Sequence, residues 1–126
     1  VAADPDALVF VVEGEKDVDA LRQRGLVATC NIHGAGKWKA EYGRWLAGRR
    51  VCILPDNDEP GRHHALAVAQ HLHDVAACVC ILALPGLPDK GDVSDWFAQG
   101  GDAGELVRLA NHTVKGWSRA FCGTQQ

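Results

Sequence analysis

The sequence lacks several features that would each indicate a particular class of protein. No apolar run approaches the ~18 residues of a membrane-spanning helix, and no signal peptide is visible, so we expect no membrane partner. A strong positive charge is also missing, because the net charge is −3 and the pI is near 6.0. No global field therefore attracts nucleic acid. An enzyme acting on nucleic acid is still allowed, since a metal ion reverses the local sign of a carboxylate cluster.

Paired cysteine motifs are absent as well. There are five cysteines but no C-x-x-C pair, so we do not expect a zinc site. Cys52, Cys78 and Cys80 lie in apolar runs, where cysteine usually acts as a small buried hydrophobe. We expect these three to be free, buried thiols, which favours a reducing cytoplasm. The 126 residues suit one domain, and a chain starting at Val1 is expected to be part of a longer protein.

Apolar runs alternate with helical patterns in a way that predicts an α/β fold. The runs predict buried strands at residues 8–12, 26–30, 51–54 and 77–84. Apolar periodicity and breakers predict helices at residues 18–24, 38–46, 61–73, 92–99 and 103–111. This order predicts a mostly parallel four-stranded sheet with right-handed crossovers and helices on both faces. We expect residues 1–111 to form the domain, and residues 112–126, which show no clear period, to be a tail or linker.

Acidic residues stand at the carboxyl ends of the first and third predicted strands. Glu13 follows the first, with Gly14 allowing a close turn, and Asp56 and Asp58 follow the third. The carboxyl ends of parallel strands meet at one edge of a sheet, so these acids should share one crevice. There they could hold a hard cation such as Mg²⁺. The alternative is that Asp56 and Asp58 form a turn and cap the following helix.

Two further acids could reach the same edge. Asp17 lies four residues after Glu13, which is one helical turn. Asp92 opens the predicted helix at 92–99, where it could equally serve as the N-cap, with Asp95 favouring the helix dipole. Capping and metal binding are compatible roles for Asp92.

The acidic segments resemble the TOPRIM domain, which bacterial-type DNA primases share with type IA and type II topoisomerases, several nucleases and recombination proteins. E-G-E-K-D at 13–17 follows an apolar strand, D-N-D-E-P-G-R at 56–62 follows another, and K-G-D-V-S-D comes at 90–95. The longer match is most similar to primase and primase–helicase proteins of phages, plasmids and integrated mobile elements. The resemblance covers residues 8–97 and implies a Rossmann-like TOPRIM fold.

The resemblance also implies an activity: metal-dependent nucleotidyl or phosphoryl transfer in DNA replication, as in the catalytic domain of a primase. Glu13 would act as metal ligand or general acid/base. Asp56 and Asp58 would hold Mg²⁺ or Mn²⁺, with Asp17 and Asp92 as further ligands. Nucleotidyl transfer needs metal to activate the attacking 3′-hydroxyl and to neutralise the leaving pyrophosphate. The implied partners are DNA or RNA and nucleoside triphosphates, with a zinc module and a helicase elsewhere in the same chain.

Basic residues beside these segments are candidates for phosphate contact: Lys16, Lys37, Lys39 and Arg62. The glycine loop at 33–37 lacks the G-x-x-x-x-G-K-[ST] pattern, so we exclude ATP binding by a P-loop. For Arg62, pairing with Asp58 is the alternative. Two other functions stay open: a TOPRIM nuclease that hydrolyses phosphodiesters, and a non-catalytic module that binds nucleic acid or a partner. An isolated domain could also bind metal without synthesis.

Histidine and tryptophan indicate no separate site. Most of the histidines on the predicted helix at 61–73 are expected on its solvated side: His63, His64, His71 and His73. The four tryptophans are expected in the core or at interfaces, with base stacking by Trp38 as the less favoured alternative.

Overall fold

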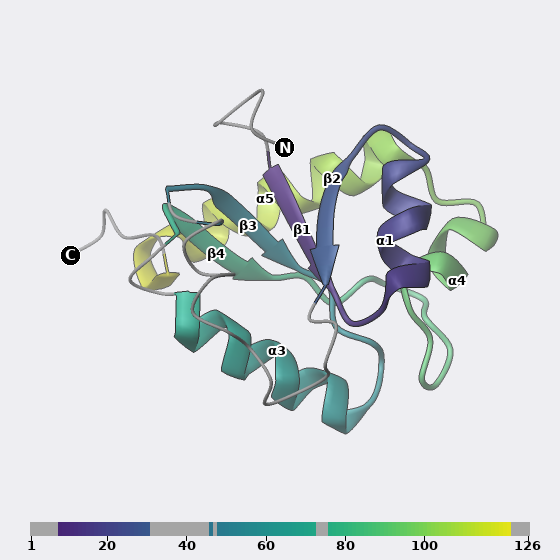
Figure 1. Ribbon diagram of the computed structural model, residues 1–126, viewed down its shortest axis with the longest axis horizontal. Coiled ribbons are helices and arrows are strands. Elements are labelled where there is room, and N and C mark those ends of the chain that lie inside the picture. The colour runs from purple at the N-terminus through teal and green to yellow at the C-terminus, as the bar shows by residue number, and fades with distance from the viewer. Residues whose placement is uncertain (1–7, 31–45, 47, 73–75, 122–126) are drawn as a thin grey trace.

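A four-stranded sheet forms the centre of the protein (Figure 1). The computed structural model describes residues 8–30, 46, 48–72 and 76–121, with residues 114–121 described by their backbone alone. The strands are β1 (Leu8–Val12), β2 (Val27–Cys30), β3 (Arg50–Ile53) and β4 (Cys78–Ile81). Their order is β2-β1-β3-β4, and every neighbouring pair is parallel. The predicted parallel sheet is confirmed.

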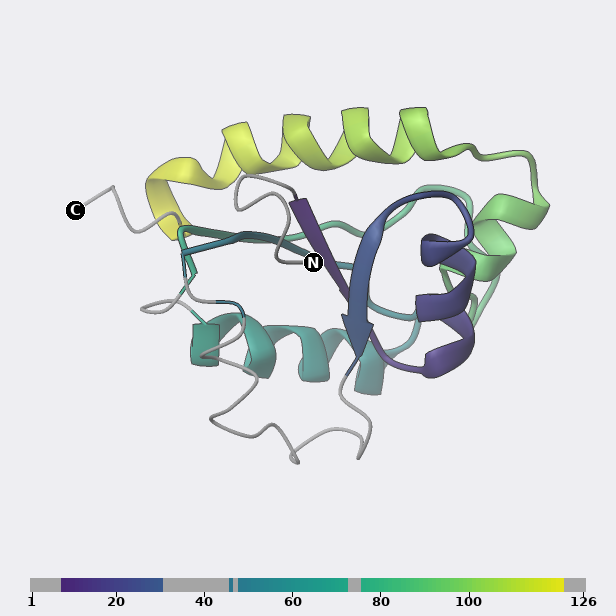
Figure 2. The ribbon, with the colours of Figure 1, turned by 45° about the horizontal axis from the view of Figure 1, so that its top comes forward.

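Helices cover both faces of this sheet, as predicted (Figure 2). The described helices are α1 (Glu15–Arg22), α3 (Glu59–Leu72), α4 (Val93–Ala98) and α5 (Ala103–Phe121). Val9 and Val11 of β1 belong to the core under α3. Phe10 and Val12 belong to the core formed with α1, α4 and α5. Both sides of each central strand are buried, which explains why the strands read as continuous apolar runs.

The last helix extends further than its sequence pattern predicts. We expect it at 103–111, but α5 continues to Phe121. Thr113 is a poor helix former, yet its hydroxyl donates a hydrogen bond of 2.9 Å to the carbonyl of Leu109 one turn earlier. The predicted end of this helix at residue 111 is therefore wrong. The domain boundary at residue 111 stays a prediction.

The cysteines follow the prediction with one exception. Cys52 and Cys80 are free and buried, as is Cys30. Cys78 is disulfide-bonded, so the prediction of a free thiol there is wrong. Cys78 begins the edge strand β4 and is only half-buried, so the core does not enclose it as it encloses Cys80. The cytoplasmic location therefore loses the support that it took from unpaired cysteines.

Some predictions fall outside the described residues. These include the helix at 38–46 except Leu46, the glycine loop at 33–37, and both Lys37 and Lys39. Leu46 itself is fully buried in the core under α3. None of the helices that the structure describes combines the length and the apolar character needed to cross a membrane.

Candidate metal centre

The carboxyl ends of β1 and β3 bring two of the predicted acids into contact. These strands are adjacent and parallel, with Val11 opposite Ile53. Glu13 therefore emerges beside the segment that follows β3, and its Oε2 accepts a 3.1 Å hydrogen bond from the backbone N–H of Asp56. The placement of Glu13 and Asp56 at one edge of the sheet is confirmed.

Gly61, in the first turn of α3, lets these acids approach one another. A Cβ at this position would lie 2.7 Å from Glu13 Oε2, 2.7 Å from the backbone oxygen of Asp56 and 2.8 Å from Asp58 Oδ1. The carboxylates of Glu13 and Asp58 therefore both border the space that a side chain at residue 61 would fill. Gly14, to which we assign the close turn from sequence, has an extended backbone with φ −142°, and a Cβ there would meet nothing within 4 Å. The glycine that the site needs is Gly61.

Asp58 acts as the cap of α3. Its Oδ1 accepts a 2.6 Å hydrogen bond from the backbone N–H of Gly61, the third residue of the helix. This is the geometry of an N-cap, which satisfies an otherwise unpaired helix N–H. The capping alternative is thus the role that the structure shows for Asp58, although its carboxylate still lies beside that of Glu13.

Asp56 also belongs to a group of three carboxylates that converge. Asp17, Asp56 and Asp92 each offer one oxygen atom, and these atoms all lie within 4.8 Å of one another. The three come from α1, from the segment after β3 and from the start of α4. Mg²⁺ binds carboxylate oxygens at about 2.0–2.1 Å, so small side-chain rotations would bring all three onto one ion. The donor set therefore fits Mg²⁺ or Mn²⁺.

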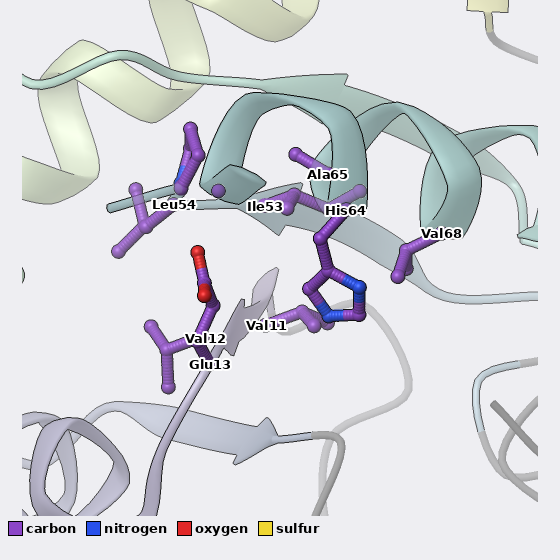
Figure 3. A pocket seen from close by; sticks show the side chains of 10 residues that line it. Val11, Val12, Glu13, Ile53, Leu54, His64, Ala65 and Val68 are labelled. Atoms are coloured by element: carbon purple, nitrogen blue, oxygen red, sulfur yellow. The ribbon is translucent and has the colours of Figure 1, made fainter. Parts of the chain in front are cut away.

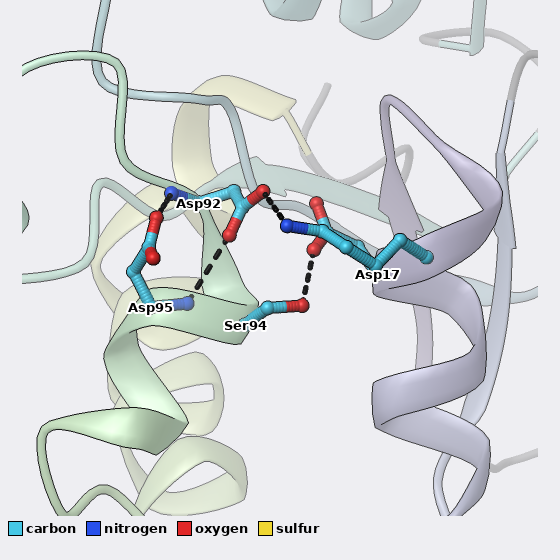
Figure 4. A network of polar contacts seen from close by, with 5 residues as sticks. Asp17, Asp92, Ser94 and Asp95 are labelled. Atoms are coloured by element: carbon cyan, nitrogen blue, oxygen red, sulfur yellow. Dashed lines mark hydrogen bonds and ion pairs between the residues drawn. The ribbon is translucent and has the colours of Figure 1, made fainter.

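A hydrogen-bond network holds two of these three acids, Asp17 and Asp92, in place (Figure 4). Ser94 Oγ donates to Asp17 Oδ1 at 2.6 Å. Asp92 accepts from the backbone N–H of Asp95 at 3.1 Å, and Asp95 accepts from the N–H of Asp92 at 3.0 Å, which is a capping box. Lys16 forms an ion pair of 3.1 Å with Asp92. The N-cap role of Asp92 is thus present, and sequence reasoning missed Ser94 although it stands inside K-G-D-V-S-D.

Burial, together with the crowding of these acids, raises the pKa of Asp56 to about 7. Partial burial is the largest cause, followed by the negative charges of Glu13, Asp17, Asp92 and Asp58. All five acids therefore interact at Asp56, which is the point where a divalent cation would relieve the most repulsion.

The other two members of the trio shift in opposite directions. Burial raises the pKa of Asp17, although the hydrogen bond from Ser94 opposes the rise. Burial also acts upward on Asp92, but the hydrogen bond and charge of Lys16 together with its bonds to Asp95 leave its pKa below the ordinary value. Asp92 therefore ionises readily, whereas Asp17 and Asp56 keep their protons to a higher pH than an ordinary aspartate.

Arg62 pairs with a residue that the sequence did not indicate. Its Nη1 donates to Asn57 Oδ1 at 3.3 Å, so the side-chain partner is Asn57 and not Asp58, the alternative considered from sequence. The Asn57 amide also donates to the carbonyls of Leu87 and Pro88 at 3.1 Å and 3.0 Å. Asn57, the middle residue of D-N-D, therefore ties the acidic turn to the loop before α4. Among the predicted phosphate contacts, Lys16 and Arg62 are described and exposed.

Comparison with known proteins gives a fold. No family model matches the chain, and no curated protein matches it. A solved structure described as "Structure of the DnaG primase catalytic domain bound to ssDNA" has a TM-score of 0.66 and 24% identity, covering 87% of this chain. The chain has a TOPRIM-like α/β fold. It spans 36% of the DnaG chain, and at this identity the likeness shows the fold alone.

The cap at the start of α3 can be tested separately from metal binding. We expect Asp58→Ala to lower the free energy of unfolding by about 1 kcal/mol, because it leaves the Gly61 N–H without its acceptor. Asp58→Asn keeps a capping oxygen and should stay within a few tenths of wild type. Urea unfolding in chelator at pH 7 measures both. If the Asn variant were as unstable as the Ala variant, the stability would depend on the charge of Asp58 and not on its capping hydrogen bond.

Proposed function

We propose that this domain catalyses metal-dependent nucleotidyl transfer on nucleic acid, as the catalytic domain of a primase-like protein. The observation that carries the proposal is the convergence of Asp17, Asp56 and Asp92 within 4.8 Å, at the carboxyl edge of a sheet with the fold of a primase catalytic domain. Carboxylates at this edge are well placed for a ligand, because open α/β sheets bind ligands outside the carboxyl ends of their strands.

The proposed roles follow from position. Asp17, Asp56 and Asp92 would hold Mg²⁺ or Mn²⁺, and the bound ion would supply activation of a 3′-hydroxyl and neutralisation of phosphate charge. Glu13, beside Asp56, serves as further ligand or as general base. Its Oε2 already accepts the N–H of Asp56, which fixes it at the edge of the cluster. Asp58 contributes negative charge while capping α3.

Single-stranded DNA and nucleoside triphosphates are the proposed partners. The DnaG primase catalytic domain of similar fold is bound to ssDNA in its solved structure. In this chain the exposed side chains of Lys16 and Arg62 lie next to the acidic cluster. Their cationic groups would contact phosphates. The proposal includes a role in DNA replication in the cytoplasm, as part of a mobile element. It also includes a zinc module and a helicase elsewhere in the same chain.

A labelled-oligonucleotide assay tests the proposal. Purified protein is incubated with Mn²⁺, nucleoside triphosphates and a single-stranded DNA template carrying a labelled primer, and products are separated by length. We expect extended products, at least about tenfold fewer with Glu13→Gln, since general-base residues contribute at least that much. Glu15→Gln, which changes an exposed acid two residues away, is the control.

Other results of the assay would overturn the proposal. Shortened products that depend on Glu13 would identify a nuclease. Unchanged DNA together with tight Mn²⁺ and DNA binding would identify a non-catalytic module.

A further inference from the structure

Asp92 reaches the acidic cluster on a loop and not from the end of a strand. Glu13 follows β1 directly, and Figure 3 shows its carboxylate pointing from the end of that strand toward α3. In contrast, β4 ends at Ile81, and the chain runs through residues 82–91 before it reaches Asp92. Within this loop Lys90 has a φ of +63°, which is uncommon outside glycine and costs free energy. Such strain persists only where surrounding contacts determine the conformation, so other residues must hold this loop.

Asn57 holds the loop with both its backbone and its side chain. Its backbone N–H donates to the carbonyl of Gly91 at 2.8 Å, and its own carbonyl accepts from the N–H of Lys90 at 2.9 Å. Its side-chain Nδ2 donates to the carbonyls of Leu87 and Pro88 at 3.1 Å and 3.0 Å. Four hydrogen bonds from one residue therefore fasten the segment that leads into the N-cap of α4.

The side chain of Asn57 suits these partners at both of its ends. The carbonyls of the loop can only accept, and they meet the amide nitrogen, which donates. The guanidinium of Arg62 can only donate, and it meets the amide oxygen at 3.3 Å. Alanine at this position would lack both groups, and aspartate would lack the donors. The amide thus joins the loop to α3 through contacts that few other side chains could make.

We infer that Asn57 is a positioning residue that sets the spacing of Asp92 from Asp56. Asn57 follows Asp56 directly in the chain, and it is bonded to the two residues directly before Asp92. It therefore links two of the three acids whose oxygen atoms lie within 4.8 Å of one another. Mg²⁺ demands near-ideal octahedral geometry, so the spacing of its carboxylates affects how tightly it binds. The inference rests on the proposed function, in which these acids hold the metal.

Mn²⁺ titration of the chain, followed by electron paramagnetic resonance, tests the inference. We expect Asn57→Ala to weaken Mn²⁺ binding by about tenfold or more, as loss of outer partners of metal sites does. In an Asp92→Asn background, which keeps an oxygen to cap α4, the same change should cost less than about threefold, because Asn57 then has no charged ligand to position. Asn111→Ala is the matched control and should bind Mn²⁺ like wild type. Asn111 also accepts from an arginine, but its partner Arg50 begins β3, at the end opposite to the acids.

Hydrogen exchange in chelator gives a second readout that needs no metal. The backbone N–H of Lys90 should exchange about tenfold faster in Asn57→Ala, because the loop loses its two bonds to the amide, while the N–H groups of β1 should exchange as in wild type. Unchanged exchange at Lys90 would overturn the hold of Asn57 on the loop. Faster exchange with unchanged Mn²⁺ affinity would overturn the positioning role, and so would an equal loss of affinity in the Asp92→Asn background. If wild type bound no Mn²⁺ while exchange still became faster, the proposed function would fail and only the hold on the loop would stand.

Discussion

Replacing Asp56 by Asn is expected to stabilise the metal-free protein at pH 8 and to remove most of its response to Mn²⁺. Burial and four neighbouring carboxylates raise the pKa of Asp56 to about 7, so its charge destabilises the folded state once it forms. Asn removes that charge with little change of shape. We expect a rise in melting temperature on the order of 5 °C, or about 1 kcal/mol, which allows for the partial exposure of Asp56 to solvent.

The same pKa predicts an unusual dependence of stability on pH. Below the ordinary value of 3.8, Asp56 is protonated in both states. Between 3.8 and about 7 only the folded state keeps the proton, so its contribution to the free energy of unfolding falls as pH rises through this window. Above this pH window Asp56 is charged in both states, and its full destabilising effect on the folded state is present. Asp56→Asn should remove this component of the fall, and Mn²⁺ should bind more tightly to wild type as pH rises through 7, because metal and proton compete for the carboxylate.

Thermal melts in chelator and in Mn²⁺, at pH 5 and pH 8, measure both effects. Asp89→Asn, which changes an exposed acid outside the cluster, is the control and should melt like wild type. Mn²⁺ stabilises wild type by mass action, and Asp56→Asn should weaken its binding by more than about a hundredfold, beyond the range for outer partners. A variant that keeps the full Mn²⁺ response would place the metal elsewhere and remove the main support for the proposed function.

The sheet and the meeting of the acids could be predicted from sequence because both follow from local pattern. Four apolar runs separated by helical segments leave few arrangements other than a parallel sheet. Glu13 and Asp56 come just after the ends of two of those runs, so parallel pairing alone brings them together. Nothing in this step requires knowledge of side-chain conformation.

Local pattern could not show which of the acids place their oxygen atoms closest together. Which oxygens converge depends on how α1 and α4 dock against the sheet, and that packing gives the central positions to Asp17 and Asp92. The burial of His64 likewise depends on which face of α3 meets the sheet. On that helix the apolar stripe includes small alanines, so a histidine can lie in it without breaking the pattern.

Gly61 is a position where a single methyl group should destabilise the fold and disturb the acidic site together. We expect Gly61→Ala to lower the free energy of unfolding by about 2–3 kcal/mol, because its Cβ would lie 2.7–2.8 Å from three oxygens, one of them the backbone oxygen of Asp56. Alanine stabilises the interior of a helix by about 1 kcal/mol relative to glycine, so the destabilisation by crowding has to exceed this amount. The site should suffer as well, since relief of the contact moves Glu13 or the Asp56 backbone, and Mn²⁺ binding should weaken.

Urea unfolding in chelator and Mn²⁺ titration of the folded variant measure the two effects of Gly61→Ala separately. The matched control is Gly14→Ala in the other acidic segment, where the backbone is extended and nothing lies within 4 Å of the new Cβ. It should leave stability unchanged or raise it by up to about 1 kcal/mol, because alanine restricts the unfolded chain. If Gly61→Ala proved as stable as wild type while Gly14→Ala unfolded readily, the close approach of Glu13 to α3 would be wrong. The glycine that follows Glu13 would then be the one that shapes the site.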